Sequence, residues 1–293
     1  MKILIADAFA PSLPGKLARF GEVTDDASQL ADADIVLVRS KTKCTAEYID
    51  SAKGLKMIIR GGVGLDNIDQ KHAKAKGIIV YNTAEASSIA VAEQAMALML
   101  AMPNQVVRAH ETMKQGIWAK KEIKRTELYR KTLGLLGAGR IATEVAKRAA
   151  AFGMKVIAFD PYVKTHPVAE MTASLDELLA ASDYISIHTP LTEETKGMLG
   201  AQAIAKMKKG VRIVNTGRAK VVIEADMRAA LESGHVAGYA TDVWYSDPPE
   251  GSPLTDAPNV LMAPHIGAST TENLLRIGDI VETLIEQYVK ERR

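Results

Sequence analysis

The sequence predicts an α/β protein with two doubly wound parallel-sheet domains. Three observations lead to this prediction. Apolar stretches of strand length alternate with helical patterns, a glycine-rich turn lies in mid-chain, and a second series of strands follows that turn. Strands that alternate with helices form parallel sheets with helical crossovers. The length of 293 residues also suggests two domains.

Short apolar stretches and helical patterns alternate in the first part of the chain. The predicted strands are Lys2–Ala6, Ile35–Arg39, Met57–Arg60 and Ile78–Tyr81. The predicted helices are Pro14–Phe20, Thr45–Ser51 and Asp69–Lys76, the last of them capped by Asp69. A longer helical pattern begins near Ser88. Pro103 lies inside it and should kink or end the helix around Met99–Met102, because proline lacks a backbone donor.

The middle of the chain has the pattern of a dinucleotide-binding unit. The predicted strand Thr132–Leu136 leads into a glycine-rich turn and an alanine-rich helix that runs to about Phe152. Gly137 would form the tight turn, and Gly139 would let the backbone approach a pyrophosphate at the helix N-terminus. Ala142 takes the place of the third glycine, which the pattern accepts.

An acid follows the next predicted strand, Lys155–Phe159. This acid, Asp160, would accept hydrogen bonds from the adenosine ribose and repel a 2′-phosphate, which favours NAD over NADP. The combination of strand, turn, helix, strand and acid is more specific than the glycines alone. The alternative interpretation is a glycine turn in an ordinary βαβ unit.

The alternation continues to the end of the chain. The later predicted strands are Tyr184–His188, Arg212–Asn215, Ala237–Thr241 and Val260–Ala263. The later predicted helices are Ser174–Ala180, Ile223–Ser233 and the amphipathic Thr270–Lys290.

Three polar segments follow these late strands, at the edge of the sheet where ligands bind in open α/β folds. Arg218 can hold a carboxylate through two parallel hydrogen bonds. His265 can exchange a proton near neutral pH. An acid of the segment Asp242–Pro248 can orient the imidazole. Taken singly, these residues could be a surface arginine, a capping histidine and a loop acid. Together, beside a dinucleotide, they indicate an active site.

Composition excludes several classes of function. A net charge of +2 without a strongly basic run argues against nucleic acid as the partner. Cys44 is the only cysteine and the six histidines lack ligand spacing, so no disulfide and no metal are expected. The N-terminus is interpreted as a strand and not as a signal peptide. The apolar stretch Ile89–Met102 contains Glu93 and is too short to span a bilayer, so we expect a cytoplasmic protein without a membrane partner.

The chain resembles the D-isomer-specific 2-hydroxyacid dehydrogenase family. It is most similar to the 3-phosphoglycerate dehydrogenase branch, in a short form without a regulatory domain, since the chain ends at Arg293 soon after the last helix. The resemblance covers nearly the whole length in the family's order. Besides the glycine-rich turn, the matching segments are Val38–Lys43, Arg60–Asp69, Thr126–Leu128, His188–Thr192, Asn215–Arg218 and Pro264–Thr270.

The resemblance implies a role for each expected catalytic residue. His265 would protonate the carbonyl oxygen during reduction and remove the hydroxyl proton during oxidation. Arg218 would polarise that carbonyl and bind the substrate carboxylate, and Asp247 would bond to His265. The loop whose backbone amides would also receive the carboxylate contains Gly62, Val63 and Gly64.

NAD is the cofactor that the resemblance implies. Asp242 would hold the carboxamide of the nicotinamide ring. The other residues expected along the cofactor are Gly137, Gly139, Arg140, Ile141, Asp160, His188, Thr189, Pro190, Thr216, Gly217, Arg218, His265, Gly267 and Ala268.

The family architecture combines a Rossmann NAD-binding domain with a discontinuous, flavodoxin-like lid domain. It places residues 99–269 in the first and residues 1–98 and 270–293 in the second, which would bind the substrate. Crossovers near Leu98 and Thr270 would act as hinges, and closure would exclude water from the hydride path.

The sequence departs from the family pattern at three places. Asp247 stands where the family has a glutamate, so its reach is shorter by one carbon–carbon bond, about 1.5 Å. Ala219 and Lys220 replace two glycines, and Lys220 would either add positive potential near the substrate or point into solvent. Glu85 lies in the loop where the family has an asparagine, and it would be unfavourable beside an anionic substrate.

The substrate is expected to be a small anionic D-2-hydroxy or 2-oxo acid, with 3-phosphoglycerate (serine biosynthesis) first. Arg39 and Arg60 match positions that would meet a substrate phosphate, unless they only fix loops. Reduction of glyoxylate or hydroxypyruvate is the alternative, and an NAD(H)-sensing binding protein is the alternative of another class. The resemblance also suggests a homodimer, with Ala90–Met102 either at the contact or in the core.

Overall fold

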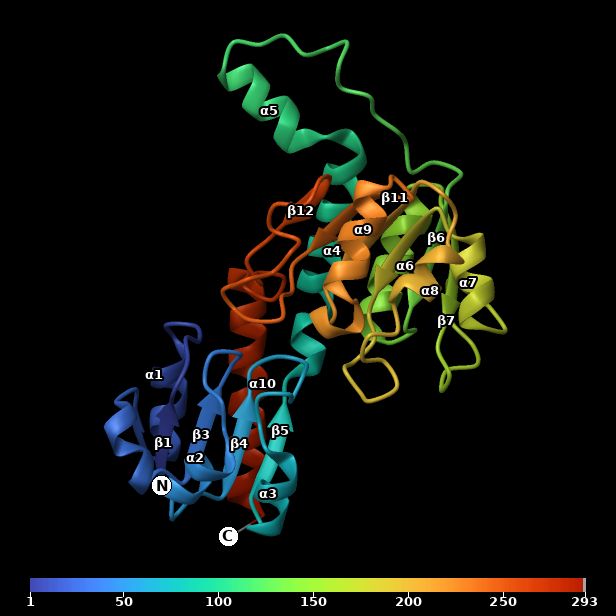
Figure 1. Cartoon of the computed structure of the whole chain (residues 1–293). Helices are drawn as coiled ribbons and strands as arrows, with labels where there is room; N and C mark the ends of the chain where they lie inside the picture. The colour runs from blue at the N-terminus through green and yellow to red at the C-terminus, as the bar shows by residue number, and fades with distance from the viewer. Residues whose placement is uncertain (292–293) are drawn as a thin grey trace. The chain divides into compact units, whose positions relative to one another are not determined.

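The computed structural model describes residues 1–291, whose strands form two separate parallel sheets (Figure 1). The chain divides into two units. Unit 1 contains Met1–Ser88 and the chain from Ala268 onward, and unit 2 contains Ile89–Gly267. The first boundary lies ten residues before the expected position after Leu98, and the second lies two residues before the expected one.

Unit 1 is a five-stranded sheet in the order β2-β1-β3-β4-β5, with every pairing parallel. Its strands are β1 (Lys2–Ile5), β2 (Glu22–Thr24), β3 (Ile35–Val38), β4 (Met57–Arg60) and β5 (Ile79–Asn82). Its helices are α1 (Leu13–Leu17), α2 (Ala46–Ser51), α3 (Gln70–Ala75) and α10 (Thr271–Lys290), with short 3-10 turns η1 (Ala18–Phe20) and η2 (Ala27–Asp32). This strand order is that of flavodoxin-like sheets, as expected.

The core of unit 1 forms because the last helix packs on the first strands. Ile277, Val281 and Ile285 of α10 are fully buried against one face of the sheet, together with Ile3 and Ile59. Asp69 caps α3 as predicted, because its carboxylate accepts the His72 N–H at 2.9 Å. The apolar residues after Thr270 recur at helical spacing and form one face of α10. This face packs on strands that lie far from α10 in the sequence.

Unit 2 is a seven-stranded parallel sheet in the order β12-β11-β10-β9-β6-β7-β8. Its strands are β6 (Thr132–Leu136), β7 (Lys155–Phe159), β8 (Glu170–Met171), β9 (Tyr184–Ile187), β10 (Val211–Asn215), β11 (Val236–Thr241) and β12 (Val260–Met262). The helices are α4 (Ala84–Asn104), α5 (Val106–Lys114), α6 (Arg140–Ala151), α7 (Leu175–Ala181), α8 (Ala201–Ala205) and α9 (Glu224–Glu232), with the short turn η3 (Ala219–Val221). Counted within the unit, this is the Rossmann order 3-2-1-4-5-6 with one further strand, and the order reverses between β6 and β9.

The predicted strands are confirmed, most of them to within one residue at each end. Two edge strands, β2 and β8, were not predicted. Each has three residues or fewer and no buried side chain, so neither shows the apolar pattern by which strands are recognised. Helix α5 was also missed, because none of its residues is buried.

Helix α4 differs from its prediction at both ends. It begins at Ala84 and ends at Asn104, so Pro103 lies in its last turn and the helix ends later than expected. With 21 residues it is long and apolar enough to cross a membrane by length and composition alone, which corrects the expectation that this segment is too short. However, 61% of the apolar window is buried inside the fold, as in a core helix.

Candidate active site

The glycine-rich turn after β6 leaves the N-terminus of α6 open to an anion. Gly137 has φ +95°, and a Cβ at this position would lie 3.0 Å from the carbonyl of His188. Gly139 is the N-cap of α6, no side chain caps the helix, and a Cβ at Gly139 would meet nothing within 4 Å. Unpaired N–H groups at such a terminus bind phosphate, so the turn fits a pyrophosphate. Arg140 and Ile141 are the first two residues of this helix.

Asp160 follows β7 and holds the glycine-rich turn in place. One carboxylate oxygen accepts the Ala138 N–H at 3.0 Å, and the other accepts the N–H groups of Tyr162 at 2.9 Å and Val163 at 3.2 Å. The acid therefore lies beside the turn, at the end of the strand where the adenosine ribose is expected.

Buried polar atoms without partners gather where the strand order reverses. His188 Nδ1, Thr189 Oγ1 and Thr216 Oγ1 are buried and have no hydrogen-bond partner among the described residues. These residues follow β9 and β10, and the backbone of His188 and Thr189 touches the Gly137 turn. Buried polar groups are normally hydrogen-bonded. The three atoms therefore fit a polar ligand that lies across the carboxyl ends of β6, β9 and β10, as a dinucleotide does.

The imidazole of His188 is neutral at physiological pH. Burial lowers the pKa of His188 to about 4, and Nε2 lies 2.9 Å from the Ser186 hydroxyl. The neighbouring Pro190 is exposed, and its carbonyl accepts a hydrogen bond from Thr195.

The turn that carries Arg218 is organised by a buried asparagine. Asn215, the last residue of β10, accepts the Gly217 N–H at 3.0 Å and donates to the Arg218 carbonyl at 3.2 Å. A Cβ at Gly217 would lie 2.9 Å from the Ile187 carbonyl oxygen, so a larger residue does not fit there. These bonds present Arg218 at the carboxyl end of β10.

Asp242 follows β11 and holds the backbone next to His265. One carboxylate oxygen accepts the Ile266 N–H at 2.9 Å and the other accepts the Gly267 N–H at 2.7 Å. Burial raises the pKa of Asp242, and these two N–H groups oppose that rise. Asp242 was expected to hold the nicotinamide carboxamide, and in the structure its carboxylate accepts hydrogen bonds from this loop.

His265 follows β12 and is joined to Asp247. His265 Nδ1 lies 2.6 Å from Asp247 Oδ2. The shorter aspartate therefore reaches the imidazole. His265 also has φ +56°, a conformation that costs a non-glycine residue roughly 1–2 kcal/mol. The bonds of Asp242 to the next two residues oppose that strain, and strain of this kind is concentrated at functional sites.

Arg218, Asp242 and His265 thus follow three neighbouring strands of one parallel sheet, β10, β11 and β12. The carboxyl ends of these strands lie at the same edge as the glycine-rich turn after β6. In open α/β sheets this is the edge at which ligands bind. A guanidinium, an imidazole with an acid partner and a dinucleotide-binding turn therefore share one edge of unit 2.

The loop after β4 in unit 1 is shaped by its glycines. Gly62 has φ +149°, and a Cβ there would lie 1.7 Å from the Arg60 guanidinium, which folds across it. Asn82 donates to the Val63 carbonyl at 2.7 Å and Thr83 N–H donates to the Gly62 carbonyl at 3.1 Å. These two hydrogen bonds fix the loop, which continues to Gly64, to the end of β5.

Arg39 lies in the loop after β3 and contacts backbone carbonyls. Its guanidinium donates to the carbonyls of Ala8 at 3.4 Å and Ala268 at 3.3 Å. Burial lowers the pKa of Arg39, and the charge of Asp7 opposes this effect. Asp7 also accepts the Arg39 N–H at 2.5 Å and the Thr42 hydroxyl at 2.7 Å. Ala268, which was expected along the cofactor, belongs to unit 1 and accepts this bond from Arg39.

Lys220 and Glu85, two of the departures from the family pattern, are exposed. Lys220 places its ammonium 6.0 Å from the centre of the Tyr245 ring, a cation–π contact. Glu85 lies in the first turn of α4, where a carboxylate is favourable to the helix dipole.

Sequence reasoning gave no role to two asparagines that support the site. Asn215 organises the arginine turn and Asn82 holds the loop after β4. Asp242 was expected at the site, but its bonds to the histidine loop were not predicted. One signal was available: an asparagine two residues before a glycine is typical of a turn closed by the asparagine side chain. The long-range bonds of Asn82 and Asp242 leave no such local signal.

Residues 96–267 match the family model described as "D-isomer specific 2-hydroxyacid dehydrogenase, NAD binding domain". The chain is 47% identical to a hydroxypyruvate reductase of Thermotoga maritima over 265 residues, which cover 89% of this chain and 86% of that protein. It is 40% identical to a D-3-phosphoglycerate dehydrogenase of Methanocaldococcus jannaschii over 99% of this chain, and it spans only 58% of that relative. The structure matches D-lactate dehydrogenase from Aquifex aeolicus complexed with NAD and lactic acid at a TM-score of 0.87 and 30% identity, covering 99% and 96% of the two chains. The chain therefore belongs to the D-isomer-specific 2-hydroxyacid dehydrogenase family and is an NAD-dependent enzyme.

Proposed function

We propose that the protein interconverts a three-carbon D-2-hydroxy acid and its 2-oxo acid, with 3-phosphoglycerate and 3-phosphohydroxypyruvate as the first candidate pair. The observation that supports this chemistry is the 2.6 Å contact between His265 Nδ1 and Asp247 Oδ2 at the ligand-binding edge of unit 2. An imidazole fixed at one nitrogen has the other nitrogen free for proton transfer.

His265 is the proposed general acid and base. Asp247 accepts the hydrogen bond of Nδ1, so Nε2 exchanges the proton with the substrate oxygen. The glycine-rich turn after β6 and Asp160 would hold NAD, which would supply a hydride acceptor for oxidation at C2 of the hydroxy acid and, as NADH, a hydride donor for reduction of the oxo acid. During reduction Nε2 gives its proton to the carbonyl oxygen, and during oxidation it takes the proton of the hydroxyl. Asp247 stabilises the imidazolium that carries this proton.

Arg218 is the proposed anchor of the substrate. Its guanidinium would bind the carboxylate and polarise the carbonyl through charge-assisted hydrogen bonds. Asn215 supports this role, because its bonds to Gly217 and Arg218 limit the conformations of the turn. The backbone amides of Val63 and Gly64 are the proposed second site for the carboxylate. In support, Gly62 has φ +149°, and Asn82 and Thr83 hold the loop through the carbonyls of Val63 and Gly62.

A phosphate on C3 is the proposed ligand of Arg39 and Arg60. In support, both arginines lie at the carboxyl ends of neighbouring strands of unit 1, β3 and β4. The two bonds of Arg39 to backbone carbonyls fix its guanidinium without neutralising the charge. Hydroxypyruvate is the second candidate substrate. The 47% identity to a hydroxypyruvate reductase of similar length favours it.

The deciding experiment compares turnover of 3-phosphohydroxypyruvate, hydroxypyruvate and glyoxylate with NADH and with NADPH. We expect the highest kcat/KM for 3-phosphohydroxypyruvate with NADH. Arg39→Gln should lower kcat/KM for this substrate about tenfold and leave hydroxypyruvate within about twofold, because one charge-assisted phosphate bond contributes on the order of 1.5 kcal/mol. If Arg39→Gln lowered kcat/KM equally for both substrates, Arg39 would not bind a substrate phosphate, and hydroxypyruvate would become the first candidate. A preference for NADPH would count against the role of Asp160 in favouring NAD.

We also propose that the protein forms a cytoplasmic homodimer through the segment after α4. Residues 106–118 expose apolar side chains, with Met113 at 56%, Ile117 at 51% and Trp118 at 73% exposure. Most of the apolar residues of Ala90–Met102, by contrast, are buried, which favours the core role of that stretch. Large exposed apolar side chains that lie together mark interaction surfaces. Trp118→Lys should shift sedimentation from dimer to monomer, whereas Tyr162→Lys, at a more exposed aromatic elsewhere, should not.

A further inference from the structure

The loop between β7 and β8 contains a half-buried histidine, His166, that none of the roles described above uses. The Nδ1 atom of His166 lies 2.9 Å from the Ala169 backbone nitrogen and 3.2 Å from that of Val168. Its other ring nitrogen, Nε2, lies 3.0 Å from the hydroxyl oxygen of Thr143 in α6. One side chain therefore contacts both its own loop and the helix that begins at the glycine-rich turn.

These contacts determine which ring nitrogen carries the proton. The backbone N–H groups of Val168 and Ala169 can only donate, so Nδ1 of His166 accepts and the proton is on Nε2. Nε2 then donates to the Thr143 oxygen, and the Thr143 hydroxyl donates to the Gly139 carbonyl at 3.0 Å. Burial lowers the pKa of His166, which keeps the ring in this neutral form.

This series of hydrogen bonds ends at the residue where the backbone is expected to approach a pyrophosphate. Gly139 is the N-cap of α6, and no side chain caps that helix. The same loop reaches the turn a second time through Asp160, whose carboxylate accepts the Ala138 N–H at 3.0 Å. Two neighbouring residues of the turn, Ala138 and Gly139, are therefore both connected to the loop after β7.

Side chains, rather than regular structure, hold this loop in its conformation. Residues 160–169 form no helix or strand. Asp160 accepts the N–H groups of Tyr162 and Val163 at the start of the loop, and His166 accepts two N–H groups at its end. The loop is thus closed on itself at both ends, and each closing side chain also connects it to the glycine-rich turn.

We propose that His166 is a positioning residue of the NAD site, which locks the loop after β7 to the start of α6 and holds the pyrophosphate-binding turn in place. His166 acts through Thr143 and Gly139 and not by contact with the cofactor. A turn that is already ordered loses less conformational freedom when a ligand binds, so the link should raise cofactor affinity. Because the link lies at the pyrophosphate and adenosine half of NAD, it should leave the hydride-transfer step unchanged.

Titration calorimetry of the full-length chain with ADP-ribose tests the proposal, since ADP-ribose has the adenosine and pyrophosphate of NAD but no nicotinamide. His166→Asn keeps an acceptor for the two N–H groups of the loop, because asparagine closes such turns, but its side chain is too short to reach Thr143. We expect the Kd of ADP-ribose to rise about fivefold, the effect of losing one neutral hydrogen bond. The KM for NADH should rise by the same factor, with kcat and the KM for the oxo acid within twofold.

Variants of Thr143 separate the link from a general loss of structure. Thr143→Ala should weaken ADP-ribose binding as much as His166→Asn does, and Thr143→Ser should restore it. The double variant should bind no more weakly than either single variant, because all three break the same link. Thr283→Ala is the matched control. The Thr283 hydroxyl makes the same kind of bond in α10, to the Asp279 carbonyl at 2.9 Å, and its loss should leave the affinity within twofold.

Three results would overturn the proposal. The first is an ADP-ribose affinity within twofold of wild type in either His166→Asn or Thr143→Ala. The second is a double variant whose loss is the sum of the two single losses, which would show that the residues act separately. The third is a fall in kcat with unchanged ADP-ribose affinity, which would place the effect at the reacting end of the cofactor.

Discussion

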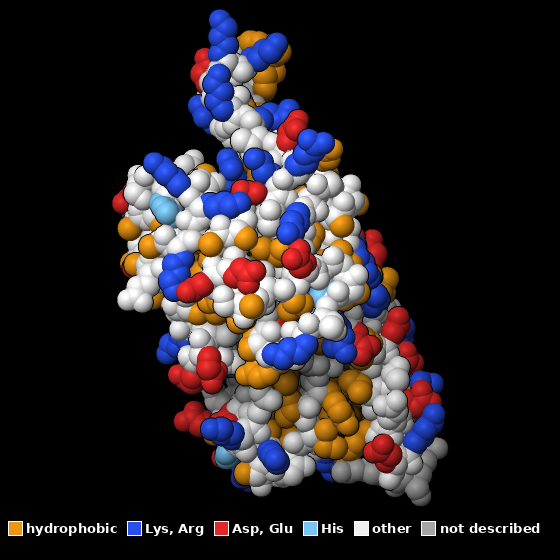
Figure 2. All heavy atoms as spheres, turned by 90° about the vertical axis from the view of Figure 1, so that its right-hand side faces the viewer, with side chains coloured by type: hydrophobic (Ala, Val, Ile, Leu, Met, Phe, Trp, Pro, Cys, Tyr) orange, Lys and Arg blue, Asp and Glu red, His pale blue; other side chains and the backbone are white. Residues whose placement is uncertain are grey.

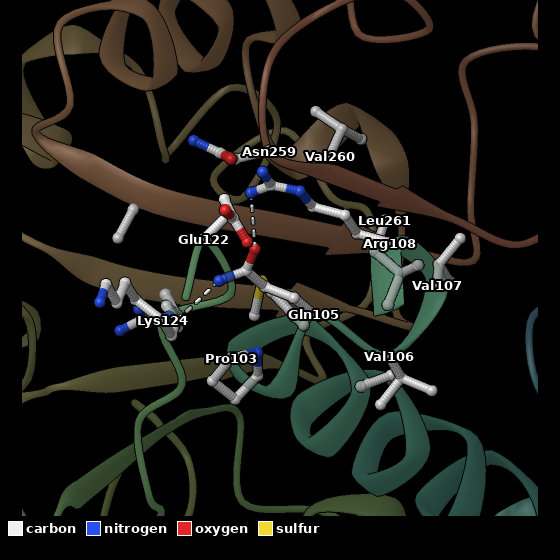
Figure 3. A pocket seen from close by; sticks show the side chains of 14 residues that line it. Pro103, Gln105, Val106, Val107, Arg108, Glu122, Lys124, Asn259, Val260 and Leu261 are labelled. Atoms are coloured by element: carbon white, nitrogen blue, oxygen red, sulfur yellow. Dashed lines mark hydrogen bonds between the residues drawn. The ribbon is translucent and has the colours of Figure 1, made fainter. Parts of the chain in front are cut away.

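At the carboxyl edge of the unit 2 sheet, three carboxylates are each bonded to a loop. At the amino edge, three cations have no carboxylate partner among residues 1–291. Asp160 binds the glycine-rich turn, Asp242 binds the backbone beside His265, and Asp247 binds the His265 imidazole. Lysine and arginine side chains cover the α5 segment and the face beside it (Figure 2). Arg108, Lys124 and Arg212 line a cavity of about 460 Å³ at the amino edge, with one exposed glutamate and two amides (Figure 3).

The difference shows how one sheet uses charge for two purposes. Acids that accept backbone N–H groups fix the position of loops, and loops fixed in this way can hold a reactive group in a strained conformation. Cations without a carboxylate partner are stabilised by solvent and give their edge a positive potential. The carboxyl edge is therefore organised before a ligand arrives, and the amino edge is a charged surface beside the segment proposed as the dimer contact.

The largest effect that tests this comparison is expected for His265→Gln. The variant removes the proposed acid and base, so kcat should fall by roughly 10²–10⁴. Steady-state kinetics with NADH measures this loss, and NADH fluorescence should show that the variant still binds the cofactor. A variant that retains wild-type turnover would show that another group transfers the proton.

Asp247→Asn is expected to have the next largest effect on rate. The amide keeps the size of the side chain but removes the charge that orients and stabilises the imidazolium. A misplaced catalytic group costs on the order of 10²-fold in rate, so kcat should fall by 10- to 100-fold. Asp247→Glu should recover part of the rate. Unchanged turnover with an unchanged pH profile in Asp247→Asn would remove Asp247 from the mechanism.

His188 should make the stability of the protein depend on pH. Its pKa falls from the ordinary 6.5 to about 4 because it is buried, so the folded state resists protonation. Its contribution to stability is therefore complete above pH 6.5 and is lost as the pH falls toward 4, with a magnitude on the order of 3 kcal/mol. Urea unfolding between pH 4 and pH 7 measures the slope. His188→Asn should flatten it and His110→Asn, at an exposed position, should not.

Asp242→Asn tests whether the loop after β12 depends on two acceptors. An amide accepts only one of the N–H groups of Ile266 and Gly267, and its NH₂ faces the other. We expect a loss of roughly 1–2 kcal/mol in the free energy of unfolding and a lower kcat, since φ +56° at His265 loses its support. If activity and stability both match the wild type, the loop is held by other contacts.

Lys220→Ala should have the smallest effect. The ammonium is exposed and lies over the Tyr245 ring, a contact that contributes about 0.5 kcal/mol at such a site. We expect KM for each oxo acid to change by less than twofold. A tenfold rise in KM for all anionic substrates would instead give Lys220 the substrate-facing role.

Local sequence patterns predicted the strands with long apolar runs and the glycine-rich turn. The strand Thr132–Leu136, the turn glycines and the acid after β7 are contiguous or nearly so, and each has a local physical reason. The sequence also named His265, Arg218 and Asp247, because polar residues that follow apolar strands collect at one sheet edge. By contrast, β2 and β8 bury no side chain, so no pattern reveals them.

Contacts between distant segments could not be predicted. The bond from Asp242 to Gly267 joins residues 25 apart, and Asn82 reaches Val63 across 19 residues. The cavity at the amino edge joins α5, the segment around Lys124 and the starts of three strands, so the charges that meet there are scattered along the sequence.

The sequence by itself determined the two parallel sheets, the dinucleotide-binding turn and the residue types available for proton transfer, because strand burial, helix caps and turns depend on neighbours in the chain. Only the tertiary structure decided that Asp247 reaches His265, that Asp242 supports the loop beside it, and that three cations line a cavity at the other edge. The physical reason is that these features depend on which strands become neighbours in the sheet, and strand order is set by packing over the whole domain.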